Sequence, residues 1–231
     1  TRYPIKTKRF LEILPGTISW MLILFPIWGS FFIPFVVAYF VLFFDVYWFY
    51  KSFNLAICAY IASRSIRKAE STNWLEKAKS LPNFQKATHV VIIPNYKEYV
   101  YKLKETLQTI ASQTFPTKRL FIVLAMEERE EDAKTKAEQL IKEFKNTFGA
   151  ILASYHPDLA GEVKGKSSNQ AYAGKKAYSD LVQTGIIDID YSTISSVDAD
   201  SIFDKQYFSY LTYQFLNDPK RYSKFWQSAN V

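Results

Sequence analysis

Two aspartates one residue apart, Asp198 and Asp200, follow the β-branched and serine-rich run 192–197. Side chains at positions i and i+2 of a strand point to the same side. An acidic pair at the point where a strand runs into a loop offers carboxylate oxygens to a hard divalent cation. The spacing therefore predicts a metal site for Mg²⁺ or Mn²⁺. The alternative is a pair of loop carboxylates that cap a helix near Phe203.

Two further segments carry residues suited to binding a charged ligand. Pro94–Glu98 (PNYKE) follows the apolar run 90–93, and Gly165–Asn169 (GKSSN) opens a helical pattern. The simpler alternatives are an acid in the first turn of a helix for Glu98 and a solvated loop lysine for Lys166. The acidic run 127–132 could also suggest a metal site, but we interpret it as the solvated start of a helix.

The charge distribution divides the chain of 231 residues into two parts. Residues 1–80 carry ten Lys/Arg and four Asp/Glu, a net charge of +6, whereas residues 81–231 carry nineteen and eighteen, a net charge of +1. The nearly neutral second part argues against a nucleic-acid partner, which needs a basic face. The two histidines, His89 and His156, stand far apart and are interpreted as ordinary surface or strand residues. The single cysteine, Cys58, allows no disulfide within the chain.

The first part has the composition of a membrane segment. From 13 to 62 the only charged residues are Asp45 and Lys51, and one bilayer crossing takes about 20 apolar residues. Basic residues flank this block on both sides, so the positive-inside rule predicts two crossings with both flanks in the cytoplasm. We expect a turn at 26–30, a second helix from Phe31, and an amphipathic surface helix over 52–68. A buried hairpin of a soluble protein is the alternative.

The second part has the pattern of an α/β domain. Short apolar runs alternate with amphipathic helical patterns, which predicts a mostly parallel sheet with helices on both faces. Ligands of such sheets bind at the carboxyl ends of the strands. The motif at 94–98 and the acidic pair therefore belong to one edge of the sheet. The predicted strands are 90–93, 120–124, 150–154 and 193–197, and the predicted helices are 99–112, 130–148 and 167–184.

The motifs together resemble those of the family-2 glycosyltransferases, inverting enzymes of GT-A fold that include membrane polysaccharide synthases. The segment Pro94–Glu98 resembles the family's P-x-Y-N-E, with Lys97 in place of asparagine. Gly165–Asn169 is similar to its G-K-x-x-A-x-N segment, with Asn169 out of strict register. The sequence DADS at 198–201 resembles the D-x-D strand end, and Phe225–Gln227 resembles the start of the acceptor-side region.

The resemblance implies a function and a set of site residues. A sugar would pass with inversion from a nucleoside-diphosphate sugar, with UDP or GDP as the nucleotide, to a glycan or lipid acceptor. The cation would offset the charge that grows on the leaving diphosphate. The implied metal ligands are Asp200 and Asp198, and Asp198 would also contact the ribose. The other implied substrate-binding residues are Pro94, Tyr96, Glu98, Lys166 and Asn169, and the implied acceptor-side residues are Trp226 and Gln227.

The same resemblance gives the expected organisation. We expect a basic cytoplasmic N-terminus (1–10), a membrane hairpin with its interfacial helix (11–63), a linker (64–86) and the donor-binding part of a truncated transferase domain (87–231). The chain would be an integral membrane protein of a prokaryotic cell membrane with its catalytic domain on the cytoplasmic side.

Two departures from the family pattern limit the implied activity. The acidic pair that reads the base after the second strand is displaced or absent at 125–128, which leaves the base open. The Asp or Glu that serves as catalytic base has no counterpart between 201 and 231, so the fragment should not transfer sugar by itself. A non-catalytic membrane scaffold with the same fold is the alternative function. A nucleotidyltransferase is less consistent, because no glycine-rich phosphate loop precedes a helix.

Overall fold

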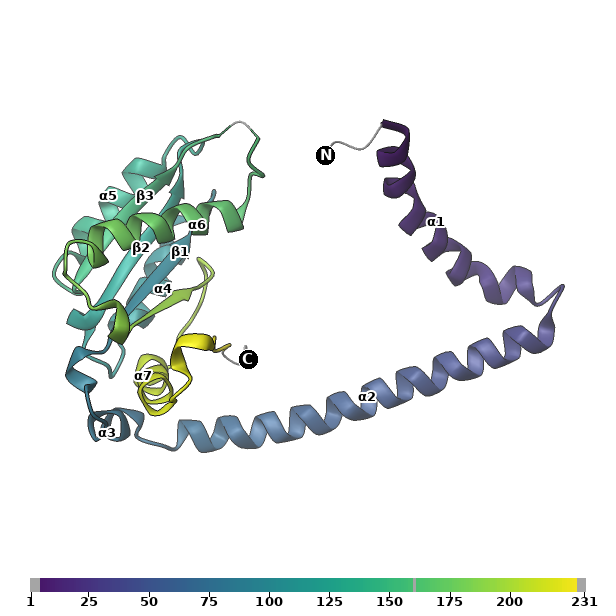
Figure 1. Cartoon of the computed structure of the whole chain (residues 1–231), viewed down its shortest axis with the longest axis horizontal. Helices are drawn as coiled ribbons and strands as arrows, with labels where there is room; N and C mark the ends of the chain where they lie inside the picture. The colour runs from purple at the N-terminus through teal and green to yellow at the C-terminus, as the bar shows by residue number, and fades with distance from the viewer. Residues whose placement is uncertain (1–4, 160, 228–231) are drawn as a thin grey trace. The chain divides into compact units, whose positions relative to one another are not determined.

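The computed structural model describes residues 5–159 and 161–227. The chain divides into two compact units, Thr1–Ser71 and Thr72–Val231. The first unit consists of two helices, and the second is built around a parallel sheet (Figure 1). Each unit is described by itself.

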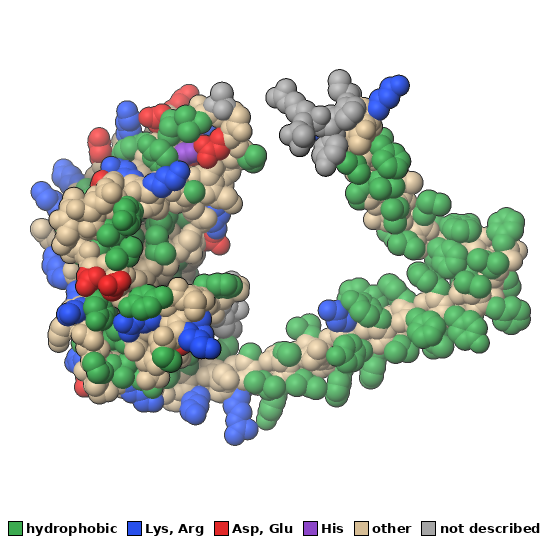
Figure 2. All heavy atoms as spheres, viewed as in Figure 1, with side chains coloured by type: hydrophobic (Ala, Val, Ile, Leu, Met, Phe, Trp, Pro, Cys, Tyr) green, Lys and Arg blue, Asp and Glu red, His purple; other side chains and the backbone are tan. Residues whose placement is uncertain are grey.

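The first unit contains the helices α1 (Ile5–Gly29) and α2 (Pro34–Glu70), joined by a short turn. At that turn the Phe25 and Phe40 rings lie 5.0 Å apart. A Cβ on Gly29 would lie 2.9 Å from the side chains of both Phe25 and Val37, so a larger residue at this position would force those side chains to shift. Figure 2 shows hydrophobic side chains along both helices. By length and composition alone, both helices could cross a membrane.

The second helix differs from the sequence prediction. The turn covers 30–33 rather than 26–30, and α2 continues without a break through 52–68, where we expected a separate surface helix. Its 37 residues correspond to about 55 Å at 1.5 Å per residue, whereas the hydrocarbon core of a bilayer is about 30 Å thick. Apolar residues continue past position 52 without a glycine or proline, so nothing in the sequence interrupts the helix.

The second unit contains one sheet of four parallel strands in the order β3-β2-β1-β4. The strands are β1 (Thr88–Pro94), β2 (Leu120–Glu127), β3 (Ala150–His156) and β4 (Ser192–Ser196). The inner strands β1 and β2 are almost completely buried, which explains their continuous apolar runs. The predicted α/β fold with a parallel sheet flanked by helices is confirmed.

Helices cover both faces of this sheet (Figure 1). The larger core joins one face of β1 and β2 to α4 (Val100–Ala111), α5 (Ala133–Phe144) and α7 (Tyr207–Asn217). The smaller core joins the other face to α6 (Lys166–Ala177), which continues through a π-helical turn at Tyr178–Val182. Helix α5 is shorter than the predicted 130–148, because the chain forms turns before Ala133 and after Phe144.

The segment expected to be a linker, 64–86, contains ordered structure. Within it lie the end of α2, the helix α3 (Trp74–Lys79) and a 3₁₀ turn at Phe84–Lys86. The Trp74 ring lies 4.4 Å from the Tyr210 ring of α7, and the backbone N–H of Trp74 donates to the side chain of Gln206 at 2.8 Å. Trp74, Ala78 and Phe84 thus anchor a polar stretch whose composition is typical of a loop.

His89 is a strand residue of β1, one of the two settings that the sequence interpretation gave, and it is buried in the core. Its ring nitrogens lie 2.6 Å from the Thr193 hydroxyl and 2.7 Å from the Thr212 hydroxyl. The Phe115 and Phe208 rings pack against the imidazole at 4.7 and 5.3 Å. Burial lowers the pKa of His89 to about 3, with a smaller effect from the charge of Arg119. The histidine therefore links β1, β4 and α7 as a neutral hydrogen-bonding group.

Candidate functional site

The carboxyl ends of β1 and β4 lie next to each other, because the two strands pair in parallel with Ile92 opposite Ser196. Pro94 is the last residue of β1, and Glu98 lies in the loop between β1 and α4. The acidic pair follows β4, where the backbone N–H of Val197 still donates to the carbonyl of Ile92 at 3.1 Å. The first and last predicted motifs thus leave the sheet from neighbouring strands at the same edge.

A tight turn presents the two aspartates. The backbone N–H of Asp198 donates to the Ser201 hydroxyl at 3.1 Å, and the backbone N–H of Ser201 donates to the Asp198 carbonyl at 3.2 Å. Between the aspartates, Ala199 is buried, and its carbonyl accepts a hydrogen bond from the Thr106 hydroxyl of α4 at 2.9 Å. The Asp200 carboxylate is exposed. The turn is thus held from the inside by α4 while it presents Asp200 outward.

The aspartates do not cap a helix near Phe203. Helix α7 begins at Tyr207 with Gln206 at its N-cap position, which makes no side-chain capping bond. The residues between the acidic pair and α7 are held instead by α4, since the backbone N–H of Phe203 donates to the Thr109 hydroxyl at 3.4 Å. The helix-capping alternative for Asp198 and Asp200 is therefore wrong.

Lys166 reaches the same turn from the other face of the sheet. It is the first residue of α6, and its ammonium forms an ion pair with the Asp198 carboxylate. Gln170, one turn later, donates to the hydroxyl of Ser196 at the end of β4. Two contacts thus hold the start of α6 beside the acidic pair, so Lys166 is not a free loop lysine.

Asn169 is buried beneath this helix start, with 1% of its surface exposed. Its side-chain amide donates to the Ala125 carbonyl at 2.7 Å. The backbone N–H of Asn95 donates to the same carbonyl at 2.8 Å. The side-chain oxygen of Asn169 has no hydrogen-bond partner among the described residues. One carbonyl of β2 thus joins the loop after β1 to the start of α6.

Glu98 contacts α4 rather than forming part of it. Its carboxylate lies 3.2 Å from the Lys102 ammonium, and no acid occupies the first turn of α4. The hydrogen bond from Lys102 to Glu98 is the main cause of the raised pKa of Lys102, and the negative charge of Asp200 makes a smaller contribution in the same direction. Lys102 therefore lies within electrostatic range of both Glu98 and Asp200.

The acidic run 127–132 is not a uniformly solvated helix start. Glu127 and Glu130 are buried, which the sequence interpretation did not foresee. Glu127 ends β2 and pairs with Arg129. The Glu130 carboxylate accepts from the Asn95 side-chain amide at 2.9 Å and lies 2.5 Å from the Lys136 ammonium.

Lys136 connects this acidic run to the loop after β1. Its ammonium donates to the backbone carbonyl of Glu98 at 3.1 Å and lies 3.1 Å from the Asp132 carboxylate. Burial of the ammonium acts to lower the pKa of Lys136, but its hydrogen bonds with Glu130 and Asp132 outweigh burial and raise it. Helical spacing alone assigns Lys136 to a solvated face, so no sequence signal identified this contact.

Tyr96 lies between two cations. Its ring centroid is 4.0 Å from the Arg129 guanidinium carbon and 5.3 Å from the Lys97 ammonium. The hydrogen bond with Glu127 is the main cause of the raised pKa of Arg129, and the Tyr96 hydroxyl contributes to it. The predicted substrate-binding residue Tyr96 is exposed, and the sequence analysis did not identify the contacts of its ring with Arg129 and Lys97.

A small hollow opens beside this pair at the carboxyl ends of β2 and β3. Its polar lining includes Glu127, Arg129, His156 and Glu162. The His156 ring nitrogen lies 3.3 Å from the Glu162 carboxylate. His156 is thus a strand residue, as the sequence interpretation allowed, and it is buried at the end of β3 and paired with an acid.

Trp226 and Gln227 follow the 3₁₀ turn at Arg221–Ser223, after α7. The Trp226 ring is 6.2 Å from the Phe215 ring of α7 and packs against the larger core. Gln227 is exposed. Neither side chain makes a hydrogen bond, ion pair or ring contact with the acidic pair or with Glu98 within the described ranges.

The described residues contain no group of three or more His, Cys, Asp or Glu side chains that could hold a metal ion. The acidic turn offers two carboxylates, one of which is ion-paired with Lys166. Carboxylate oxygens suit Mg²⁺ or Mn²⁺, and Mg²⁺ sites commonly use one or two carboxylates together with the phosphates of a substrate. The donor atoms present therefore fit a cation that arrives with a phosphorylated ligand.

The chain matches no family model, and it matches no curated protein. Among solved structures it is similar to the mannosyltransferase PcManGT from Pyrobaculum calidifontis in complex with GDP-Man and Mn²⁺. The identity is 17% and the TM-score is 0.42 over 64% of this chain and 40% of that chain. This chain thus corresponds to less than half of the mannosyltransferase.

Proposed function

We propose that this chain is the donor-binding part of a membrane-anchored family-2 glycosyltransferase of GT-A fold. It would act in metal-dependent, inverting transfer of a sugar from a UDP- or GDP-sugar to a glycan or lipid acceptor. The observation that carries the proposal is the meeting of three separate sequence motifs at one edge of the sheet. Glu98 and the acidic pair follow the neighbouring strands β1 and β4, and Asp198 forms an ion pair with Lys166 at the start of α6.

Each residue would have a role that follows from its surroundings. Asp200 and Asp198 would hold the cation, which offsets charge on the departing diphosphate when it is bound. Glu98 would accept hydrogen bonds from the nucleoside beside Tyr96 and Pro94. Lys166 would exchange its carboxylate partner for a phosphate oxygen, assisted by the free N–H groups at the start of α6. The proposal assigns no catalytic base to this chain.

The first unit would serve as the anchor. Its long apolar helices suit a bilayer, and basic residues stand in the first turns of α1 and in the last turn of α2, including Arg9, Arg67 and Lys68. Under the positive-inside rule both flanks would be cytoplasmic, so the second unit would meet cytoplasmic sugar nucleotides. Tyr47 and Trp48, whose rings lie 5.8 Å apart, would stand at the interface.

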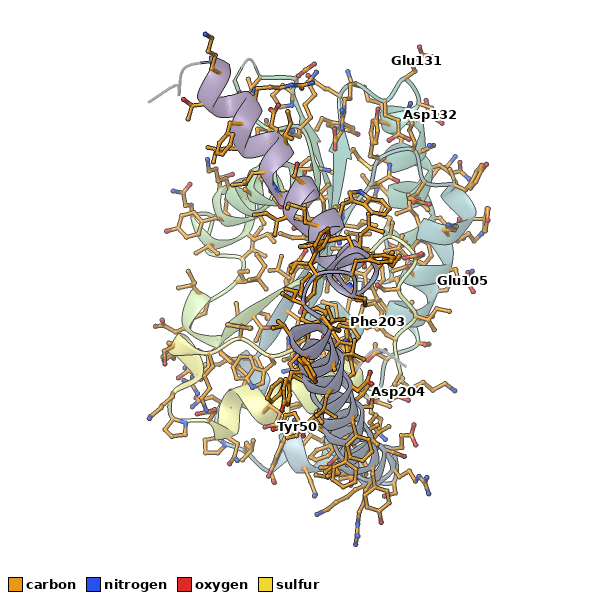
Figure 3. The ribbon with its side chains drawn as sticks, turned by 90° about the vertical axis from the view of Figure 1, so that its right-hand side faces the viewer. Tyr50, Glu105, Glu131, Asp132, Phe203 and Asp204 are labelled. Carbon is orange, nitrogen blue, oxygen red and sulfur yellow. The ribbon has the colours of Figure 1, made fainter. Side chains whose placement is uncertain are left out.

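The test is nucleotide binding by the whole chain in nanodiscs, measured by titration calorimetry with UDP and GDP, with and without Mn²⁺. We expect Mn²⁺ to strengthen nucleotide binding about tenfold or more, which is the effect of one additional contact of a charged group. Asp200→Asn should remove this gain. Glu105→Gln is the matched control, because Glu105 is an exposed carboxylate of α4 that points away from the domain (Figure 3).

Equal affinity with and without Mn²⁺, or an Asp200→Asn variant that behaves as the wild type, would contradict the proposal. A chain that binds neither nucleotide under any condition would support the alternative function, a non-catalytic membrane scaffold. A loss of binding in both Asp200→Asn and Glu105→Gln would indicate a general effect of surface charge and would also count against the assigned metal site.

A further inference from the structure

Lys97 has an unusual backbone conformation. Its φ of 62° places it in the left-handed region, which it shares with one other described non-glycine residue, Asn83. Asparagine tolerates this region because its short polar side chain bonds locally, whereas a long side chain gains no such compensation. The loop between β1 and α4 therefore keeps a lysine where asparagine or glycine would be less strained. Backbone strain of this kind clusters at ligand-binding sites.

The Lys97 ammonium also lacks a carboxylate partner among the described residues. Its recorded contact is the Tyr96 ring at 5.3 Å, and the guanidinium of Arg129 lies 4.0 Å from the same ring. The neighbouring acid Glu98 is already paired with Lys102, and Glu127, the acid nearest to Arg129 on the other side of the Tyr96 ring, is paired with Arg129. Lys97 and Arg129 thus share the Tyr96 ring. Lys97 has no carboxylate partner among the described residues and can bind an anion.

We propose that Lys97 binds a phosphate oxygen of a nucleoside diphosphate at this edge of the sheet. The inference rests on the proposed function and assigns the residue a role that the sequence motifs did not give it. The loop that carries Lys97 follows β1, whose carboxyl end lies beside the end of β4, and β4 leads into the acidic turn. A nucleoside diphosphate that binds the acidic turn through a cation would have further phosphate oxygens available to the β1–α4 loop. The lysine would supply there a charge that asparagine lacks.

The experiment compares Lys97→Asn and Lys97→Arg with the wild-type chain in nanodiscs. Affinities for UDP and GDP with Mn²⁺, and for uridine and guanosine, are measured by calorimetry, and melting temperatures by circular dichroism. Lys97→Asn should lower the affinity for both diphosphates about tenfold, the effect of one hydrogen bond to a charged group. Its melting temperature should rise by about 2–4 °C, because the backbone strain is relieved. Nucleoside affinity should not change.

Lys97→Arg keeps both the charge and the strain, so its affinity and melting temperature should match the wild type. Lys145→Asn is the matched control for net charge. Lys145 is exposed at the end of α5, and α5 runs back from the carboxyl edge of the parallel sheet, which places Lys145 at the opposite edge. A structural role alone would move stability and affinity in the same direction, whereas phosphate binding moves them in opposite directions.

Unchanged diphosphate affinity in Lys97→Asn, with the Mn²⁺ and Asp200 dependence intact, would overturn this inference and leave the proposed function standing. An equal loss of nucleoside and diphosphate affinity would also overturn it, because it would indicate a change of loop shape. A loss in Lys145→Asn as large as in Lys97→Asn would point to net charge and refute the specific contact. A wild-type chain that binds no nucleotide would overturn both proposals.

Discussion

Acidification should destabilise the second unit through one residue, His89. Since Thr212 donates its hydroxyl proton to the Phe208 carbonyl at 2.7 Å, it accepts a proton from Nε2 of His89. Nδ1 of the imidazole then accepts from the Thr193 hydroxyl. The neutral ring satisfies both bonds, whereas a second proton would bury an uncompensated charge beside the positive charge of Arg119.

The magnitude follows from the shift in pKa. The pKa of His89 is about 3 in the folded chain against 6.5 for an unperturbed histidine. A lowered pKa means that the unfolded state binds more protons between these values, so stability is complete above pH 6.5 and falls as the pH drops toward 3. At about 1.4 kcal/mol per pH unit, the loss between pH 7 and pH 4 is about 3 kcal/mol.

The assay is urea unfolding of the purified chain in detergent at pH 7.0, 5.5 and 4.0, followed by near-ultraviolet circular dichroism. His89→Gln can still donate to and accept from the two threonines but does not titrate. Other groups titrate equally in both proteins, so the difference between their pH dependences isolates His89. The wild type should lose about 3 kcal/mol more than the variant. Parallel curves, within about 1 kcal/mol over this range, would refute the reasoning whatever the absolute stability of His89→Gln.

Three further substitutions test the contacts at the edge of the sheet. Thr106→Val removes the hydroxyl that holds the Ala199 carbonyl; it should cost about 1–3 kcal/mol in urea unfolding and weaken Mn²⁺-dependent UDP binding, and unchanged binding would contradict the assigned role. Lys136→Met leaves the buried Glu130 carboxylate without its cation and should cost about 3–5 kcal/mol, whereas a loss below about 1 kcal/mol would contradict it. Gly149→Ala places a Cβ 2.5 Å from a backbone carbonyl. It should lower the melting temperature by several degrees, since a loss of 1 kcal/mol corresponds to about 2–4 °C. An unchanged melting temperature would show that the turn before β3 can shift freely.

The order of strands and helices was predictable because burial on both faces produces continuous apolar runs. Val90–Ile93 and Leu120–Leu124 have the length and the apolar composition of buried strands, and both lie in the centre of the sheet. The meeting of the two motifs at 94–98 and 198–200 followed from the same rule, since parallel strands end at a common edge. Local composition was sufficient here because each buried strand shows its burial within its own few residues.

Contacts between distant segments were not predictable from local pattern. Glu130 and Lys136 look like members of a solvated helix start, but tertiary partners from the loop after β1 make their burial favourable. Thr106 sits on a helix face whose apolar neighbours are easy to identify, while its hydroxyl has a specific acceptor 93 residues away. Trp74 likewise gives order to a polar stretch through packing against α7.

The carbonyl of Ala125, which accepts from both Asn95 and Asn169, has a consequence for how this architecture tolerates change. Every amino acid supplies a backbone oxygen, so the junction survives replacement of Ala125 by any residue small enough for its buried position. It does not survive a change of length, because inserting or deleting one residue in β2 would turn the carbonyl at this place toward β3 instead of β1. The junction at this point of the chain therefore depends on spacing rather than on chemical identity.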